Sequence, residues 1–267
     1  MTKPADYVNI FSTPAIILRR IEYGDYDYIL TFMTPSHGKI SAIAKNAKKS
    51  VKRFSGVLEL FYSLDIVVRE GRKLSFLEEA SIEESFPGIR SDIIKTAYAS
   101  FWNEVIVQWL EEGVLQKKVY DLLEYALTEL DLGNRSPEEI SIIFQMKFLD
   151  IVGFTPELKN CGECDTDIED IEKTRLVFDI KNGWLLCDNC KRILEKRRPV
   201  QLVPLSKGTV KQLLWLQNND AEKLKRIKMS GNATYEGLRL LESFLPFHLE
   251  KELRSLKFLK KIRRKDL

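Results

Sequence analysis

The sequence predicts an α+β fold, in which an N-terminal OB-type β-barrel is followed by a helical domain carrying a four-cysteine zinc module. Three observations predict it. Short segments with a hydrophobic period of two run to Glu78 and are separated by tight turns. A period near 3.6 follows Pro87, and two Cys-x2-Cys pairs interrupt the helical part. We place the barrel at residues 1–82, the helical domain at 83–157 and 196–267, and the zinc module at 158–195.

Five short strands make up the predicted barrel. Turn residues separate them, including Gly24, the Pro35–Gly38 segment and Gly71. One long loop, Lys45–Gly56, joins the third strand to the fourth. This pattern suits a small closed barrel, which leaves apolar strands without exposed edges. The strands are predicted at Ala15–Glu22, Tyr28–Thr34, Lys39–Ala44, Leu58–Val68 and Lys73–Glu78.

Helices are predicted from Ser91 to Glu112 and from Lys117 to Leu132, because each segment has a broad apolar stripe. The next helix has a complete start signal, with Ser136 as N-cap, Pro137 at the first position and Glu139 three residues on. It ends before Gly153. Further helices are predicted to begin at Ser206 and Thr234, with a last one in the basic C-terminal segment.

All four cysteines form one pattern, Cys161-x2-Cys164 and Cys187-x2-Cys190, with 22 residues between the pairs. A Cys-x2-Cys turn presents two thiolates to one ion, and two such turns complete a zinc tetrahedron. The segment Arg175–Trp184 reads as a hairpin that sets the two turns side by side. Two disulfides are unexpected in a cytosolic protein, and a redox pair would be single. Four thiolates leave no open position, so we predict one structural Zn²⁺.

Basic residues are concentrated in two segments. Residues 39–53 carry six basic residues and no acid, and residues 251–265 carry eight and one. The net charge of the whole chain is only +3, so the remainder is net negative. Two such patches on an acidic body form a surface that a polyanion recognises. The first patch lies on the barrel loop, and OB-type barrels bind single strands through a groove and its flanking loops.

No catalytic signature accompanies these patches. Phosphate-binding glycine loops, zinc-protease and nucleophile-elbow motifs are absent from the sequence, and neither His37 nor His248 has a motif partner. There is no secretory signal and no apolar run long enough for a membrane span. We therefore expect a cytoplasmic protein that acts by binding, with no membrane contact and no enzyme activity.

Several segments, taken in order, resemble the RecO family of bacterial DNA repair proteins. Ala15–Leu30 resembles that family's opening barrel signature, and Gly38–Lys49 its basic loop entrance, with Asn46 where the family usually has glycine. Tyr98–Glu104, Gly153–Leu158 and Leu253–Leu259 match as well. The order of the five segments along the chain makes the resemblance specific.

The resemblance implies a function as well as a fold. It implies binding of single- and double-stranded DNA, annealing of complementary strands without ATP, and help in loading the RecA recombinase onto strands coated by the single-strand-binding protein SSB. The implied partners are the acidic C-terminal tail of SSB and the ring-forming mediator RecR. The implied cofactor is one structural zinc ion.

Combining the resemblance with the charge pattern gives the expected contact residues. DNA contacts on the barrel are predicted for Arg19, Arg20, Lys39, Lys45, Lys48, Lys49, Lys52 and Arg53. Phe54 is the preferred base-stacking residue, although Tyr23, Tyr26 and Tyr28 also flank the basic segments. Contacts with DNA or the SSB tail are predicted for Lys257, Lys260, Lys261, Arg263 and Arg264.

Two other functions remain open at the level of sequence. One is a zinc-containing OB-fold RNA-binding or transcription-associated factor, which would present the same basic loop. The other is a nuclease, which would need an acidic cluster to hold magnesium; the sequence offers no credible one.

Overall fold

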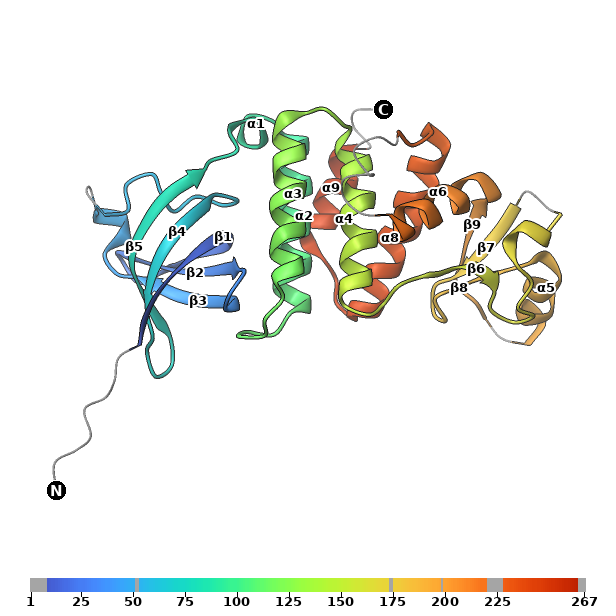
Figure 1. The fold of residues 1–267 in the computed structure, drawn as a ribbon, viewed down its shortest axis with the longest axis horizontal. Coiled ribbons are helices and arrows are strands. Elements are labelled where there is room, and N and C mark those ends of the chain that lie inside the picture. Colours follow the sequence, from blue (N-terminus) through green and yellow to red (C-terminus); the bar gives the residue numbers. More distant parts are fainter. Residues whose placement is uncertain (1–8, 51–52, 173–174, 198, 220–227, 264–267) are drawn as a thin grey trace, which may run out of the picture. The chain divides into compact units, whose positions relative to one another are not determined.

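A computed structural model describes residues 9–50, 53–172, 175–197, 199–219 and 228–263 (Figure 1). The chain forms two compact units. The first comprises Met1–Leu132 with Phe258–Leu267, and the second comprises Gly133–Lys257. The three-part division drawn from the sequence stays a prediction. Among the described helices, none is long and apolar enough to cross a membrane.

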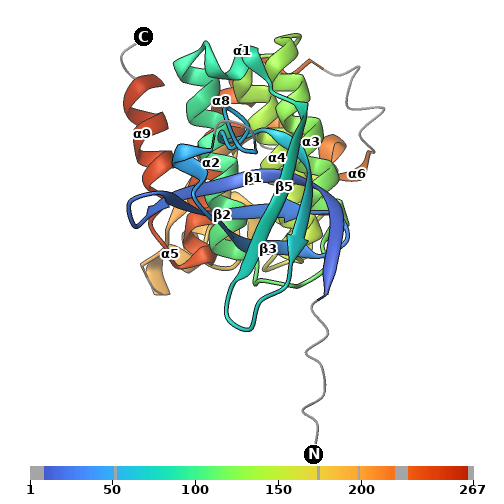
Figure 2. The same ribbon diagram turned by 90° about the vertical axis from the view of Figure 1, so that its left-hand side faces the viewer.

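The first unit contains a closed five-stranded barrel, as the sequence predicts. Its strands close in the order β1-β2-β3-β5-β4, with β3 and β5 parallel and the other pairs antiparallel. Figure 2 shows this barrel facing the viewer. The strands are β1 (Ile10–Tyr23), β2 (Asp27–Thr34), β3 (Gly38–Ala44), β4 (Ser63–Arg69) and β5 (Ser75–Glu84).

Three strand boundaries differ by more than two residues from the predicted ones. The first strand, β1, begins at Ile10 and not at Ala15. The predicted fourth strand begins at Leu58, but β4 begins at Ser63. The cause is Phe61, whose φ of +73° lies in the left-handed region and interrupts an extended chain. Leu60 is correspondingly 37% exposed, although the alternation placed it inside. The last strand, β5, continues past its predicted end at Glu78 as far as Glu84.

The barrel core is filled by inward-facing strand residues and closed by side chains from the long loop. Ile17, Phe32 and Leu64 are fully buried, and Phe54 and Leu58 of the loop pack against the same cluster. Burying a side chain of this size stabilises the fold by about 1.5–3 kcal/mol. The loop Lys45–Gly56 is therefore anchored to the barrel at its C-terminal end.

The described helices of the first unit are α1 (Pro87–Arg90), α2 (Ile93–Trp109), α3 (Lys117–Leu132) and the end of α9 (Arg254–Arg263). Helix α2 contacts β1 and α3 contacts β2, while α1 packs against α2 and α3. A β-bulge interrupts the pairing of β1 with β2 at Leu18. The buried amide of Asn103 on α2 donates to the carbonyl oxygens of Ile17 and Leu18, both at 3.1 Å. This contact fixes the bulge, after which β1 continues through Arg19 and Arg20.

The second unit combines three long helices with a four-stranded sheet. The helices are α4 (Pro137–Ile151), α6 (Lys207–Asn218) and α8 (Gly231–Leu249), with the shorter α5 (Asp188–Arg197) beside the sheet. The sheet order is β6-β8-β7-β9, from β6 (Glu157–Cys161), β7 (Arg175–Asp179), β8 (Trp184–Leu186) and β9 (Leu202–Ser206).

Capping side chains explain where these helices begin. The Ser136 hydroxyl accepts the Glu139 N–H at 3.2 Å, as predicted, while the Glu139 carboxylate accepts the N–H of Met229 at 2.8 Å. The Ser206 cap of α6 is also as predicted, with its hydroxyl accepting from Thr209. The helix expected at Thr234 begins earlier, at Gly231, because Ser230 provides its cap.

Candidate zinc site and nucleic-acid interface

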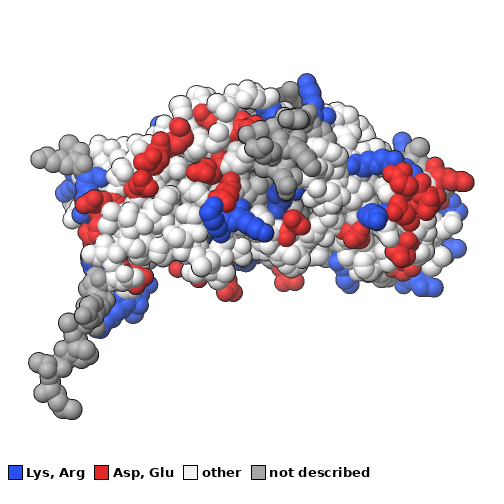
Figure 3. All heavy atoms as spheres, viewed as in Figure 1, with Lys and Arg blue, Asp and Glu red and all other residues white. Residues whose placement is uncertain are grey.

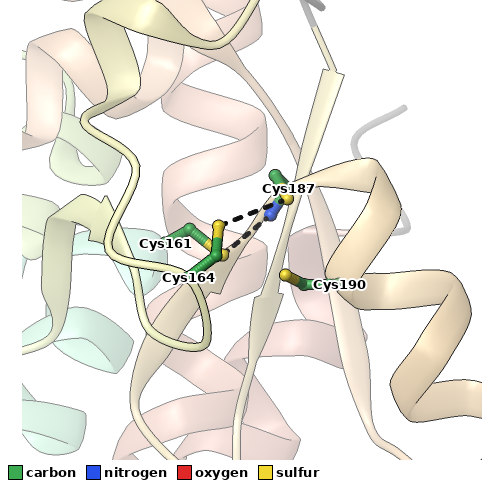
Figure 4. Close-up of side chains that lie close together, drawn as sticks. All are labelled: Cys161, Cys164, Cys187 and Cys190. Atoms are coloured by element: carbon green, nitrogen blue, oxygen red, sulfur yellow. Dashed lines mark hydrogen bonds between the residues drawn. The ribbon is translucent and has the colours of Figure 1, made fainter.

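The four cysteines meet at one point of the second unit. Their sulfur atoms all lie within 4.8 Å of one another (Figure 4). Cys164 and Cys187 Sγ are 3.9 Å apart, and the Cys187 N–H donates to Cys161 Sγ at 3.4 Å. Cys161 ends β6 and Cys187 follows β8, which pair in parallel, and Cys190 lies in the first turn of α5. The sheet and the helix therefore bring the two Cys-x2-Cys pairs together.

The first cysteine turn depends on a glycine. A Cβ at Gly162 would lie 2.2 Å from the ring of Trp184 on the neighbouring strand β8, a distance that no side chain tolerates. The Gly162 N–H donates to the Leu185 carbonyl at 2.8 Å, and the Cys161 N–H to that of Thr166 at 2.9 Å. The predicted hairpin is also present, because β7 and β8 pair antiparallel around Gly183, whose φ is +77°.

The thiols differ in how readily they lose a proton. The Thr166 hydroxyl lies 3.2 Å from Cys164 Sγ and lowers the pKa of this exposed thiol to about 6. Burial raises the pKa of Cys187 and of Cys190 above the usual range. Sulfur donors in two Cys-x2-Cys turns, at this spacing, match the chemistry of a tetrahedral site for one soft metal ion.

The basic loop is held against the turn that joins β1 and β2. Lys45 Nζ lies 2.7 Å from Asp27, whose other carboxylate oxygen accepts the Asn46 N–H at 2.8 Å. Lys48 Nζ lies 2.8 Å from Glu22. The hydrogen bonds from Lys48 and Lys45 hold the pKa of Glu22 and of Asp27 below the usual range. Figure 3 likewise shows basic side chains next to acidic ones over the barrel.

The other predicted barrel cations are also placed by contacts. The Lys49 ammonium lies 3.5 Å from the ring centroid of Tyr26. The Arg53 guanidinium donates to the Lys45 carbonyl at 3.0 Å, and half-buried Arg20 lies 2.8 Å from Glu59. The exposed basic residues of the loop are Lys45, Lys48, Lys49 and Arg53, and we call the surface they form the loop face. Arg19 is exposed on the strand β1, on the side opposite Arg20, because successive side chains of a strand alternate. Lys52 lies outside the described residues.

Two predicted DNA contacts are buried and lie outside this face. Phe54 is only 3% exposed and packs in the barrel core, so it offers no ring to a base. Lys39 is 8% exposed, and its ammonium donates to the carbonyl oxygens of Val107, at 2.7 Å, and Leu110 at the end of α2. The sequence pattern marked both as part of a basic run, but burial excludes them from a surface.

Lys39 therefore has a structural role that a substitution can test. We expect Lys39→Met to lower the free energy of unfolding by about 1–3 kcal/mol, because two buried carbonyls lose a charged donor. The salt dependence of DNA affinity should stay at the wild-type value. Urea denaturation measures the free energy of unfolding of the variant, and a salt titration measures its DNA affinity. A weaker salt dependence than that of the wild type would show that Lys39 contacts DNA.

The C-terminal basic patch lies on α9. Leu256 and Leu259 are buried, and Lys257 forms an ion pair with Glu252. The Arg263 guanidinium donates to the hydroxyl of buried Tyr98 at 3.2 Å. Lys261 is exposed and Lys260 is half-buried, whereas Arg264 lies outside the described residues. The helix thus carries cations on one side and inserts leucines on the other.

The carboxylates that pair with the loop cations were not predicted as part of this surface. The sequence pattern placed Glu22 at the end of the first strand and gave no role to Asp27 or Glu59. The hairpin register supplies the missing signal, because Glu22 pairs with Tyr28 and Tyr28 with Ala44 across three strands. That register brings the end of β1 close to the start of the loop.

Comparisons with known proteins agree with this architecture. A family model described as Recombination protein O N terminal matches residues 8–86, and one described as Recombination protein O C terminal matches residues 90–257. The chain belongs to the RecO family. A protein from Desulfatibacillum aliphaticivorans, named DNA repair protein RecO, is 44% identical over 257 residues, which cover 95% of this chain and 98% of the relative.

Further relatives carry the same name. The DNA repair protein RecO of Desulfosudis oleivorans is 40% identical over 95% of this chain and 98% of its own length. That of Syntrophus aciditrophicus is 33% identical over 96% of this chain and 97% of its own. Membership of the RecO family assigns the chain a role in DNA repair and recombination.

Proposed function

We propose that this RecO family member binds single- and double-stranded DNA, anneals complementary strands without ATP, and assists the loading of RecA onto SSB-coated single strands. The observation that carries the proposal is the loop face. Its basic residues belong to one loop of the barrel. Two ion pairs and the buried side chain of Phe54 fix this loop on the barrel. A fixed array of cations offers phosphates a preformed surface.

Annealing requires that two polyanions approach each other. Cations on a protein relieve the repulsion by displacing the counterions condensed on DNA. The loop face would hold one strand through its phosphates, with little sequence preference, because phosphate contacts carry no sequence information. Such contacts also make the affinity fall steeply as the salt concentration rises.

The basic patch on α9 supplies the second contact. Lys257, Lys260, Lys261 and Arg263 would hold the other strand or the acidic C-terminal tail of SSB, since both are anionic. We add Arg264 to these contacts because of its positive charge, since it lies outside the described residues. RecR is a further partner in this proposal. The contact with RecA is indirect, because displacing SSB from the strand makes room for RecA to load. The protein would act in the cytoplasm, at the nucleoid.

The cysteine cluster would hold one Zn²⁺ through Cys161, Cys164, Cys187 and Cys190. A shell of four thiolates has no open position, so the ion would cross-link the two turns and take no part in chemistry. The residues around it stabilise the same arrangement, because Gly162 allows the close approach of Trp184. The zinc site would therefore stabilise the fold of the second unit.

A strand-annealing assay tests the proposal. Two complementary oligonucleotides, one labelled with a donor and one with an acceptor dye, should pair several-fold faster with the protein than without it, in the absence of nucleotide. An unchanged rate would contradict the proposal. Affinity for single-stranded RNA well above that for DNA would favour the RNA-binding alternative, and magnesium-dependent cleavage of either strand would favour a nuclease.

A further inference from the structure

One aromatic side chain of the loop face is exposed and fixed at the same time. Tyr26 lies in the turn between β1 and β2 and is 42% exposed. Its backbone carbonyl accepts the Lys48 N–H at 3.0 Å, which ties the turn to the 3-10 helix Ala47–Lys49. The ion pairs of Lys45 and Lys48 with Asp27 and Glu22 join the same two segments. The Tyr26 backbone is therefore held from both sides.

A cation lies directly over this ring. The Lys49 ammonium is 3.5 Å from the Tyr26 centroid, within the range of a cation–π contact. A phosphate attracts an ammonium more strongly than a ring does, because it carries a full negative charge. A strand arriving at the loop face therefore draws Lys49 to its backbone and uncovers the ring. The side chains supply, in one place, what a nucleotide needs: a π face for the base and a cation for the phosphate.

The neighbouring aromatic residues Phe54, Tyr28 and Tyr23 fit this role less well. Tyr23 is 53% exposed, but no described cation lies over its ring. Phe54 is buried in the barrel core. Tyr28 is half-buried, with Arg20 at 5.1 Å and Lys48 at 5.6 Å from its ring centroid, and both of these cations are also bound to carboxylates. Tyr26 is exposed, and the Lys49 ammonium lies over its ring. Among the interactions described for the Lys49 side chain, this ring contact is the only one.

We propose that Tyr26 and Lys49 form a stacking subsite for one unpaired nucleobase, with Lys49 moving from the ring to the adjacent phosphate as the base enters. This inference rests on the proposed DNA binding. Bases in a duplex already stack on their neighbours and are not free to enter. The subsite therefore favours single strands over the paired product, which helps an annealing protein release the duplex.

Oligonucleotides with and without bases test the subsite. Binding of an oligothymidine and of an abasic strand of equal length and charge is measured by fluorescence anisotropy at one salt concentration. Stacking on an aromatic residue is worth about 1–3 kcal/mol per base, so the wild-type protein should prefer the oligothymidine by roughly 5- to 150-fold. Tyr26→Ala should lose most of that preference, and Tyr26→Phe should keep it.

The controls separate the subsite from folding and from the proposed function. Tyr235→Ala removes a tyrosine that is 66% exposed on α8, in the other unit, and should leave the preference unchanged. Thermal unfolding checks that Tyr26→Ala folds like the wild type. A wild-type protein that binds both strands equally, or a Tyr26→Ala protein with the wild-type preference, overturns the subsite alone. A wild-type protein that binds neither strand overturns the proposed DNA binding.

Discussion

Replacing Lys48, Lys49 and Arg53 together with alanine is expected to lower the affinity for single-stranded DNA by roughly ten- to a hundredfold at low salt. The three residues are cations of the loop face, and each can neutralise a phosphate, Lys48 by exchanging its ion pair with Glu22. A single-stranded site loses about 0.7 in the slope of log affinity against log salt for each phosphate contact removed. The slope should therefore become shallower by about 2.

A matched triple variant controls for total charge. Lys196, Arg197 and Lys211 are exposed cations of the second unit, and their replacement removes the same charge elsewhere. We expect this control to keep the wild-type slope. If the loop variant kept that slope as well, the loop face would not contact DNA phosphates. Titrations monitored by fluorescence anisotropy at several salt concentrations give both slopes.

Cys187→Ser is expected to abolish high-affinity zinc binding and to destabilise the second unit by several kcal/mol. The apparent free energy of zinc binding in structural sites is about 10–16 kcal/mol, and it is coupled to folding. The ion would cross-link the two cysteine turns, whose sulfur atoms lie within 4.8 Å of one another, and the substitution removes that cross-link. Elemental analysis should find one zinc per wild-type chain, and chelation should lower the unfolding temperature as the substitution does.

Glu163→Gln provides the control, because this exposed residue lies between Cys161 and Cys164 and supplies no sulfur. It should leave the metal content and the unfolding temperature unchanged. A metal-free wild-type protein as stable as the metal-loaded one would contradict a structural role for zinc. The barrel belongs to the other unit, so the DNA affinity of Cys187→Ser should fall much less than its stability.

Local patterns were sufficient to predict most of the fold. Alternating apolar residues and turn glycines placed the five strands, and Ser136 with Pro137 marked the start of α4 within one residue. Deviations arose where a single residue overrode the pattern. Phe61 adopts a left-handed φ that no propensity predicts, and Ser230 caps α8 before its predicted start at Thr234. The strands β6 and β9 were missed because they are short and pair with distant partners.

The cysteine cluster and the loop face differed in how far sequence could predict them. The spacing of the cysteines specifies their convergence, because each pair lies in one turn. The loop face depends on burial and pairing instead. Lys39 and Lys49 look alike in the sequence, yet one caps α2 inside the protein and the other lies over an exposed ring. Periodicity alone cannot distinguish them, since the difference comes from the carbonyl oxygens at the end of α2, which only the Lys39 ammonium reaches.

Annealing of SSB-coated strands tests the central claim most directly. Complementary strands are first saturated with SSB, and pairing is followed by energy transfer with the protein present or absent and with no nucleotide added. Our account predicts that the protein restores rapid pairing, and that the Lys48, Lys49 and Arg53 triple variant restores much less of it. Pairing that stays as slow with the wild-type protein as without it would contradict the account.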